Sequence, residues 1–130
     1  MRRDDRAFWT KLCLNAPREI LGAACAASDG ELVRDPALRD LLIACAREAA
    51  ASVSREGHRP FVANLERAVI KACLDHPKHR SSALRALKSR RRTGLPESVG
   101  PILAAARRTG ASAPLLTRLY HVMRRLERTP

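Results

Sequence analysis

The feature that most limits the fold of this chain is a series of apolar stripes with helical spacing, separated by proline and glycine. After Asp35-Pro36, apolar residues recur every three or four positions up to Gly57, which places them on one face of a helix. Asp accepts hydrogen bonds from the first free amides of a helix, and Pro fits its first position. The residues of this stripe are Leu38, Leu41, Leu42, Cys45, Ala46 and Ala49.

Further stripes follow along the chain, each opened by a proline or by a serine that can cap a helix. They run from Pro60 to His76, from Ser81 or Ser82 to Leu87, from Pro96 to Gly110, and from Pro114 to Leu126. No alternating β-branched run bounded by turns occurs, so no strand is predicted. We therefore predict an all-α fold, a compact bundle of five to six helices, with residues 1–130 forming a single domain.

The first predicted helix, from Asp5 to about Ala27, is apolar on nearly all sides, Phe8 and Trp9 included. A helix of this kind is normally a buried central one, so we expect residues 7–26 to be the most buried segment. Lys11, Asn15 and Glu19 are spaced four apart and share one face of this helix. Such a polar line is either a paired structural network or the floor of a site, and the pattern does not decide between them.

The spacing of the cysteine and histidine residues does not predict a metal site. No CxxC pair occurs, and each cysteine lies in a helical apolar pattern, so we expect small core residues rather than zinc ligands or disulfides. His76 and His79 have a ligand-like spacing, but the simpler interpretation is a solvated loop. The four cysteines are Cys13, Cys25, Cys45 and Cys73.

The net charge of +12 implies attraction to anions: nucleotide phosphates, a carboxylate ligand, nucleic acid or an acidic partner. The strongest basic run, Lys88 to Arg92, has the plain interpretation of a solvated helix end. An aromatic content of 3% is a poor stacking platform and argues against nucleic acid. No apolar run approaches the ~18 residues of a membrane span, and no signal peptide is found, so a cytoplasmic location is expected.

Several motifs resemble, in order and spacing, the C-terminal domain of the ketopantoate reductase family. That domain opens with a W-x-K-x-x-x-N helix and an N-G-E-L turn, and the resemblance spans about residues 7–127. The matching segments are Phe8 to Asn15, Gly30-Glu31-Leu32, Arg55 to His58, Arg80 to Leu84, and Pro114 to Tyr120.

The resemblance implies an NADPH-dependent reduction of a 2-keto acid in pantothenate biosynthesis. It also implies a helical fold like the C-terminal domain of 6-phosphogluconate dehydrogenase, which follows an N-terminal Rossmann domain. By this resemblance Lys11 is the catalytic general acid, a role that suits protonation of the alkoxide left by hydride addition. Asn15 and Ser82 match substrate-binding positions. Glu19, where the family has Asn, is a further substrate-binding candidate.

Other positions depart from the family pattern. Gly94 stands at the place of a substrate-binding glutamate, Pro96 replaces the acid two residues further on, and Asp29 replaces the Asn before Gly30. Because glycine offers no carboxylate for the diol of ketopantoate, this departure argues against ketopantoate and leaves a plainer 2-keto acid open.

No GxGxxG follows a predicted strand, and the chain leaves no room for a nucleotide-binding domain. We therefore expect no bound NADPH and no activity from the chain alone, and assign no cofactor-binding residue. A homodimer or a separate Rossmann-domain partner is expected, through the first helix or the helix from Pro114. The alternatives are a basic helical module that binds an acidic protein or nucleic acid, and a complete enzyme of 130 residues.

Overall fold

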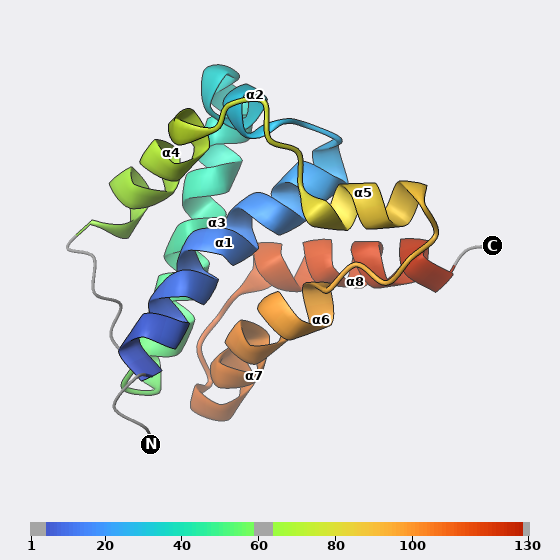
Figure 1. Ribbon diagram of the computed structural model, residues 1–130. Helices are drawn as coiled ribbons and strands as arrows, with labels where there is room; N and C mark the ends of the chain where they lie inside the picture. Colours follow the sequence, from blue (N-terminus) through green and yellow to red (C-terminus); the bar gives the residue numbers. More distant parts are fainter. Residues whose placement is uncertain (1–4, 59–63, 129–130) are drawn as a thin grey trace.

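The computed structural model describes residues 5–58 and 64–128 (Figure 1). Within these ranges every regular element is a helix, and the one β-type contact is an isolated bridge between Ser28 and Arg80. The all-α prediction is confirmed. The helices are α1 (Asp5–Cys25), α2 (Asp29–Arg34), α3 (Pro36–Arg55), α4 (Leu65–Asp75), α5 (Ser82–Lys88), α6 (Leu95–Ser98), α7 (Gly100–Thr109) and α8 (Pro114–Arg128).

The described residues form eight helices, more than the five or six expected, because two short helices were not foreseen. The first of these, α2, begins at a capping box: Ser28 accepts from the Glu31 amide, and the Glu31 carboxylate accepts from the Ser28 amide at 2.7 Å. The second, α6, results from a break at Val99 in the stripe that begins at Pro96. Pro101 favours this break, since it has no amide to continue the hydrogen bonds of α6.

Most predicted helix ends are found where the sequence places them. Asp35 caps α3 by accepting from the Ala37 amide at 2.9 Å, Ser81 caps α5, and Gly110 ends α7 with a φ of 72°. The predicted start at Pro60 lies outside the described residues, and α4 is capped by Asn64. These local signals held because each depends on only a few neighbouring residues.

The prediction that the first helix is central is confirmed. Helix α1 packs against α2, α3, α4, α5, α6 and α8, and crosses the middle of the bundle in Figure 1. Cys13, Ala16 and Ile20 of α1 join one apolar cluster, and Leu21 joins a second one between α2, α3 and α4. The core therefore lies on both sides of this helix.

Two residues predicted to be buried are not. Phe8 is 50% exposed, and Cys25 is also exposed. Phe8 lies at the rim of a pocket, and Cys25 lies in the last turn of α1, where the chain leaves the core for α2. The other three cysteines are buried as expected, and burial raises the pKa of Cys13, Cys45 and Cys73 to about 12, so their thiols stay protonated.

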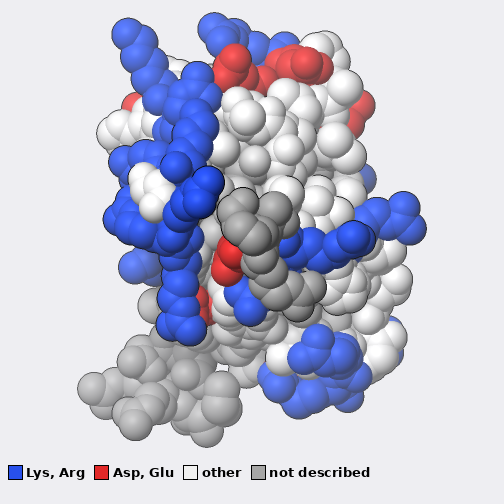
Figure 2. All heavy atoms as spheres, turned by 90° about the vertical axis from the view of Figure 1, so that its right-hand side faces the viewer, with Lys and Arg blue, Asp and Glu red and all other residues white. Residues whose placement is uncertain are grey.

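Basic side chains gather on one side of the molecule. Figure 2 shows a band of Lys and Arg along one edge of the side that is on the right in Figure 1, where α5 and the end of α8 lie.

No helix in the described part of the chain is long and apolar enough to cross a membrane. Within the same ranges, no group of three His, Cys, Asp or Glu residues lies close enough to hold a metal ion.

Candidate functional site

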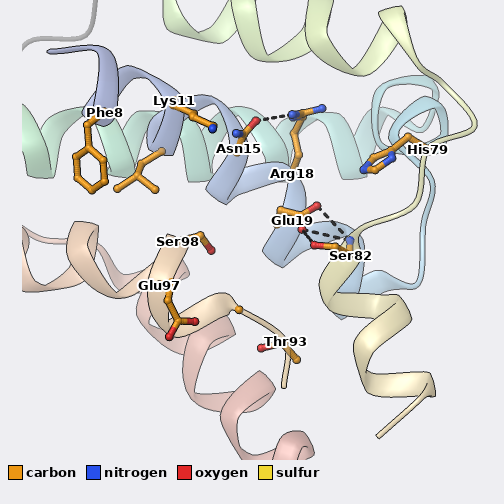
Figure 3. A pocket seen from close by; sticks show the side chains of 12 residues that line it. Phe8, Lys11, Asn15, Arg18, Glu19, His79, Ser82, Thr93, Glu97 and Ser98 are labelled. Carbon is orange, nitrogen blue, oxygen red and sulfur yellow. Dashed lines mark hydrogen bonds between the residues drawn. The ribbon is translucent and has the colours of Figure 1, made fainter. Parts of the chain in front are cut away.

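A pocket of about 550 Å³ lies between α1 on one side and α5 and α6 on the other (Figure 3). All four site residues predicted from the sequence, and the departing Gly94, line this pocket. Its full lining is Phe8, Lys11, Leu12, Asn15, Arg18, Glu19, His79, Ser82, Thr93, Gly94, Glu97 and Ser98.

Helix α1 supplies the floor of the pocket through the polar line that its sequence predicted. Lys11, Asn15 and Glu19 follow one another at intervals of one turn along the pocket side of α1. Lys11 is exposed at the edge of the pocket, and among the described residues its ammonium group has no hydrogen-bond or ion-pair partner. Both features left open by the sequence are present: the polar line forms the floor of a pocket, and Asn15 and Glu19 of this line are also paired with protein groups.

Asn15 is oriented by Arg18. The Arg18 guanidinium donates to the Asn15 side-chain oxygen at 2.6 Å, to the Leu14 carbonyl at 3.2 Å, and to Asp29 at 2.9 Å. Arginine has only donors, so the atom that faces it must be the amide oxygen of Asn15. The amide nitrogen of Asn15 therefore keeps its hydrogens for a ligand.

Asp29 anchors this arrangement from the start of α2. Its residue is 2% exposed, and its carboxylate forms a salt bridge with Arg18. Burial raises the pKa of Asp29, while the charge of Arg18 and its hydrogen bond oppose that rise. The pair thus links α2 to the floor of the pocket, and positions Arg18 for its contact with Asn15.

Glu19 and Ser82 join α1 to the first turn of α5. The Glu19 carboxylate accepts from the Ser82 amide at 3.2 Å and also from the Ser82 hydroxyl, and the neighbouring Ser81 hydroxyl donates to the Glu19 carbonyl at 2.8 Å. Because its hydrogen is engaged with Glu19, the Ser82 hydroxyl offers a ligand only lone pairs.

The opposite wall is formed by the loop before α6 and by α6 itself. Gly94 has a φ of 76°, a conformation that glycine adopts without strain, and it precedes the first residue of α6. Thr93 donates to Glu127 of α8 and accepts from the Leu95 amide at 3.2 Å, which fixes the loop. Glu97, in the first turn of α6, brings a carboxylate to the pocket three residues after Gly94.

Several pocket residues were not foreseen as site residues, among them Arg18, Glu97, Phe8 and His79. Arg18 had a usable signal, since it follows Asn15 by three positions on a helix and so lies near it. Glu97 could have been found had α6 been recognised. Phe8 was assigned to the core. His79 was expected to be a solvated loop residue and is indeed exposed. Its loop is held beside the pocket because the amide of Asp29, far away in the sequence, donates to the His79 carbonyl at 2.9 Å.

The pocket offers complementary groups at its two walls. The α1 wall presents the Lys11 ammonium and the Asn15 amide hydrogens, which suit the oxygens of a carboxylate or a carbonyl. The α6 wall presents the Glu97 carboxylate, which suits hydroxyl donors. The arrangement therefore fits a small oxygen-rich molecule with its anionic end toward α1.

Known proteins resemble the chain along most of its length. A profile of the family described as "Ketopantoate reductase PanE/ApbA C terminal" matches residues 5–127. The 2-dehydropantoate 2-reductase of Shigella flexneri is 30% identical over 120 residues, which make up 92% of this chain and 39% of that protein. The chain thus spans about two fifths of the length of this relative.

Solved structures show the same fold. A PanE/ApbA family ketopantoate reductase from Ralstonia eutropha JMP134 superposes with a TM-score of 0.85 at 24% identity, covering 94% of this chain and 41% of that one. A dimeric ketopantoate reductase from Staphylococcus aureus gives a TM-score of 0.84 at 16% identity, covering 98% of this chain and 44% of that one.

Proposed function

Because the chain belongs to the ketopantoate reductase PanE/ApbA C-terminal family, we propose that it is the substrate-binding part of an NADPH-dependent reductase of 2-keto acids. The observation that carries the proposal is the α1 wall of the pocket, where Lys11 has no partner among the described residues and Asn15 keeps its amide hydrogens. The comparisons give no support to a basic module that binds nucleic acid or an acidic protein.

In the proposed reaction, Lys11 protonates the oxygen that was the ketone of the substrate. A bound nicotinamide cofactor would supply hydride to the substrate. The Lys11 ammonium would then donate a proton to the oxygen of the reduced carbonyl group. Asn15 would donate to an oxygen of the 2-keto acid and hold it beside Lys11. Glu97 and the lone pairs of Ser82 would accept from hydroxyl groups further along the substrate, while Glu19 keeps Ser82 in place.

The described residues offer no fold that would hold the nucleotide part of the cofactor. Their elements are helices, whereas the glycine-rich dinucleotide site needs a strand before its loop. We propose that a Rossmann domain, from outside these 130 residues or from a partner chain, supplies that site. The chain by itself is then expected to lack reductase activity, and turnover of any 2-keto acid by the purified chain would contradict this.

The experiment that tests this function joins the chain to the nucleotide-binding domain of a ketopantoate reductase and follows NADPH consumption. Ketopantoate and unbranched 2-keto acids serve as substrates. We expect Lys11→Met to lower kcat by about 10²- to 10⁴-fold, the range typical of a general acid. Lys71→Met is the matched control, because Lys71 lies on α4 in an exposed pair with Asp75. Full activity of Lys11→Met would refute the proposal.

We also propose that the chain forms a homodimer. Val122 and Leu126 of α8 are 46% and 48% exposed, and Phe8 of α1 is 50% exposed. The same apolar patch on two copies of the chain can pack against itself about a twofold axis, which buries both patches. The Staphylococcus aureus relative is dimeric. Light scattering should give twice 14.4 kDa, more firmly as salt screens the charge of +12. A monomer at high protein and salt concentrations would contradict it.

A cytoplasmic location agrees with four free thiols.

A further inference from the structure

A second pocket, of about 360 Å³, adjoins the first one near the start of α5. The two pockets share Ser82, Thr93 and Gly94, so a single ligand can extend from one into the other. The remaining lining is Ala86 and three arginines, and we use the name arginine pocket for the hollow formed by Arg85, Arg91 and Arg92.

The charges of this hollow are uncompensated. No Asp or Glu lines the arginine pocket, and none of its three guanidinium groups has a hydrogen bond or ion pair among the described residues. The nearby carboxylate of Glu127 is engaged with Thr93 and Arg124. Several arginines elsewhere form ion pairs, among them Arg18–Asp29, Arg47–Glu66 and Arg108–Glu56.

The turn after α5 brings these arginines together. Arg90 has a φ of 57°, in the left-handed region, and the Arg91 amide donates back to the Ala86 carbonyl at 2.7 Å. This is the hydrogen bond that closes a Schellman turn, which reverses the chain at the end of a helix. It directs Arg91 and Arg92 back toward Arg85, so that the three side chains line one pocket.

The main pocket has a different balance. Lys11 shares it with the carboxylates of Glu19 and Glu97, and Arg18 is already paired with Asp29. One anionic group at Lys11 is therefore compensated, whereas a second anion in the same pocket would meet two carboxylates. A second anion in the arginine pocket would meet only cations.

We propose that the arginine pocket binds a second anionic group, a carboxylate or a phosphate, of a ligand whose 2-keto acid end lies at Lys11 and Asn15. This rests on the proposed function and narrows it: the substrate class is a 2-keto acid with an anionic group at its far end. Guanidinium groups bind carboxylates and phosphates through paired hydrogen bonds, which suits this role. A small anion is favoured over an acidic macromolecule because the arginines line a hollow that is continuous with the main pocket.

The first test measures the anion site alone, with inorganic phosphate as the probe. Chemical shifts of the ¹⁵N-labelled chain are followed during a phosphate titration, with shifts expected in residues 85–94. Arg91→Gln/Arg92→Gln should weaken binding about five- to tenfold, from two exposed charge-assisted contacts. Arg39→Gln/Arg67→Gln removes the same charge from exposed positions outside this pocket, and should leave the affinity within about twofold. Equal losses in both double variants would overturn the proposal, because they would mean attraction by net charge only.

The second test compares 2-oxoglutarate with 2-oxopentanoate, and 2-oxoadipate with 2-oxohexanoate, on the same labelled chain. At least one diacid should bind about five- to tenfold more tightly than its monoacid, and the arginine double variant should remove that difference. Equal binding of each diacid and its monoacid would overturn the proposed subsite while leaving the proposed function intact. If phosphate binds but no 2-keto acid does, the proposed function fails and the second-anion proposal falls with it.

Discussion

The substitution Asp29→Asn tests the link between α2 and the floor of the pocket. It replaces one carboxylate oxygen by an amide group of nearly the same shape, so the packing at the start of α2 should persist. What it removes is the charge that faces Arg18 at 2.9 Å. The new side-chain amide would still offer an oxygen to Arg18, so Arg18 would lose its ion pair but keep an acceptor.

The expected cost follows from the burial of the two side chains. The Asp29 side chain is 3% exposed and that of Arg18 is 19% exposed, so water reaches only part of the guanidinium. Breaking a fully buried pair costs roughly 3–5 kcal/mol, and a hydrogen bond to a charged group contributes about 1.5–3 kcal/mol. An acceptor remains, Arg18 is partly solvated, and burial raises the pKa of Asp29, so the folded state already disfavours the charge that is removed. We therefore expect a loss of only about 1 kcal/mol in the free energy of unfolding.

A companion variant, Arg18→Met, should cost more at neutral pH, about 3 kcal/mol, because it leaves the Asp29 carboxylate buried without a cation. Burial already raises the pKa of Asp29, and loss of Arg18 removes the main influence that opposes this rise. A carboxyl group whose pKa is higher in the folded state makes that state bind more protons, so stability falls as pH rises above the usual aspartate pKa. Mildly acidic buffer should therefore restore part of the stability of this variant.

Urea unfolding followed by helical circular dichroism measures these changes. With a slope of about 2 kcal/mol per molar, a loss of about 1 kcal/mol moves the midpoint by about 0.5 M. The double variant should lose less than the sum of the two single losses, since each single change already breaks the same pair. Additive losses, or Asp29→Asn within about 0.5 kcal/mol of the parent, would refute the inference that this pair holds the floor in place.

Three further predictions concern local geometry and pH. Ala26→Gly should stabilise by about 1 kcal/mol, seen as a higher Tm, because Ala26 has a φ of 51° at the end of α1; a lower Tm would contradict this. Gly30→Ala should destabilise by about 2 kcal/mol or more in urea, because a Cβ would lie 2.9 Å from the Cβ and carbonyl of Pro77; an unchanged midpoint would contradict the contact. The hydrogen bond from Arg108 lowers the pKa of Glu56 to about 2 from its usual 4.5. The stability that this pair gives the folded state is therefore present above pH 4.5 and is lost as pH falls toward 2. Glu56→Gln should flatten this part of the stability profile, and an unchanged slope would count against the pair.

Local patterns predicted much of the fold. The helical stripes and the caps at Asp35 and Ser81 depend on residues within a few positions of one another, so they were visible in the sequence. The same holds for the line of Lys11, Asn15 and Glu19, whose shared face follows from the helix period alone. The central place of α1 followed from its apolar circumference.

Features that depend on contacts between distant segments could not be predicted in this way. Phe and Cys are residue types that are usually buried, but the Phe8 and Cys25 side chains are exposed in the folded chain. His79 enters the pocket because its loop is bound to the start of α2. The basic run from Lys88 to Arg92 was recognised, yet its hollow shape depends on a left-handed residue at Arg90, where propensity favours glycine.

The central claim is that the α1 wall of the main pocket binds the 2-keto acid end of a substrate. The most direct measurement is a titration of the ¹⁵N-labelled chain with ketopantoate and 2-oxopentanoate, with assignment of the Asn15 side-chain amide. The account predicts the largest shifts at that amide and at the backbone of Lys11, Ser82 and Glu97, and loss of binding in Lys11→Met. Shifts centred on α3 and α4, or no shifts at saturating concentrations of either acid, would contradict it.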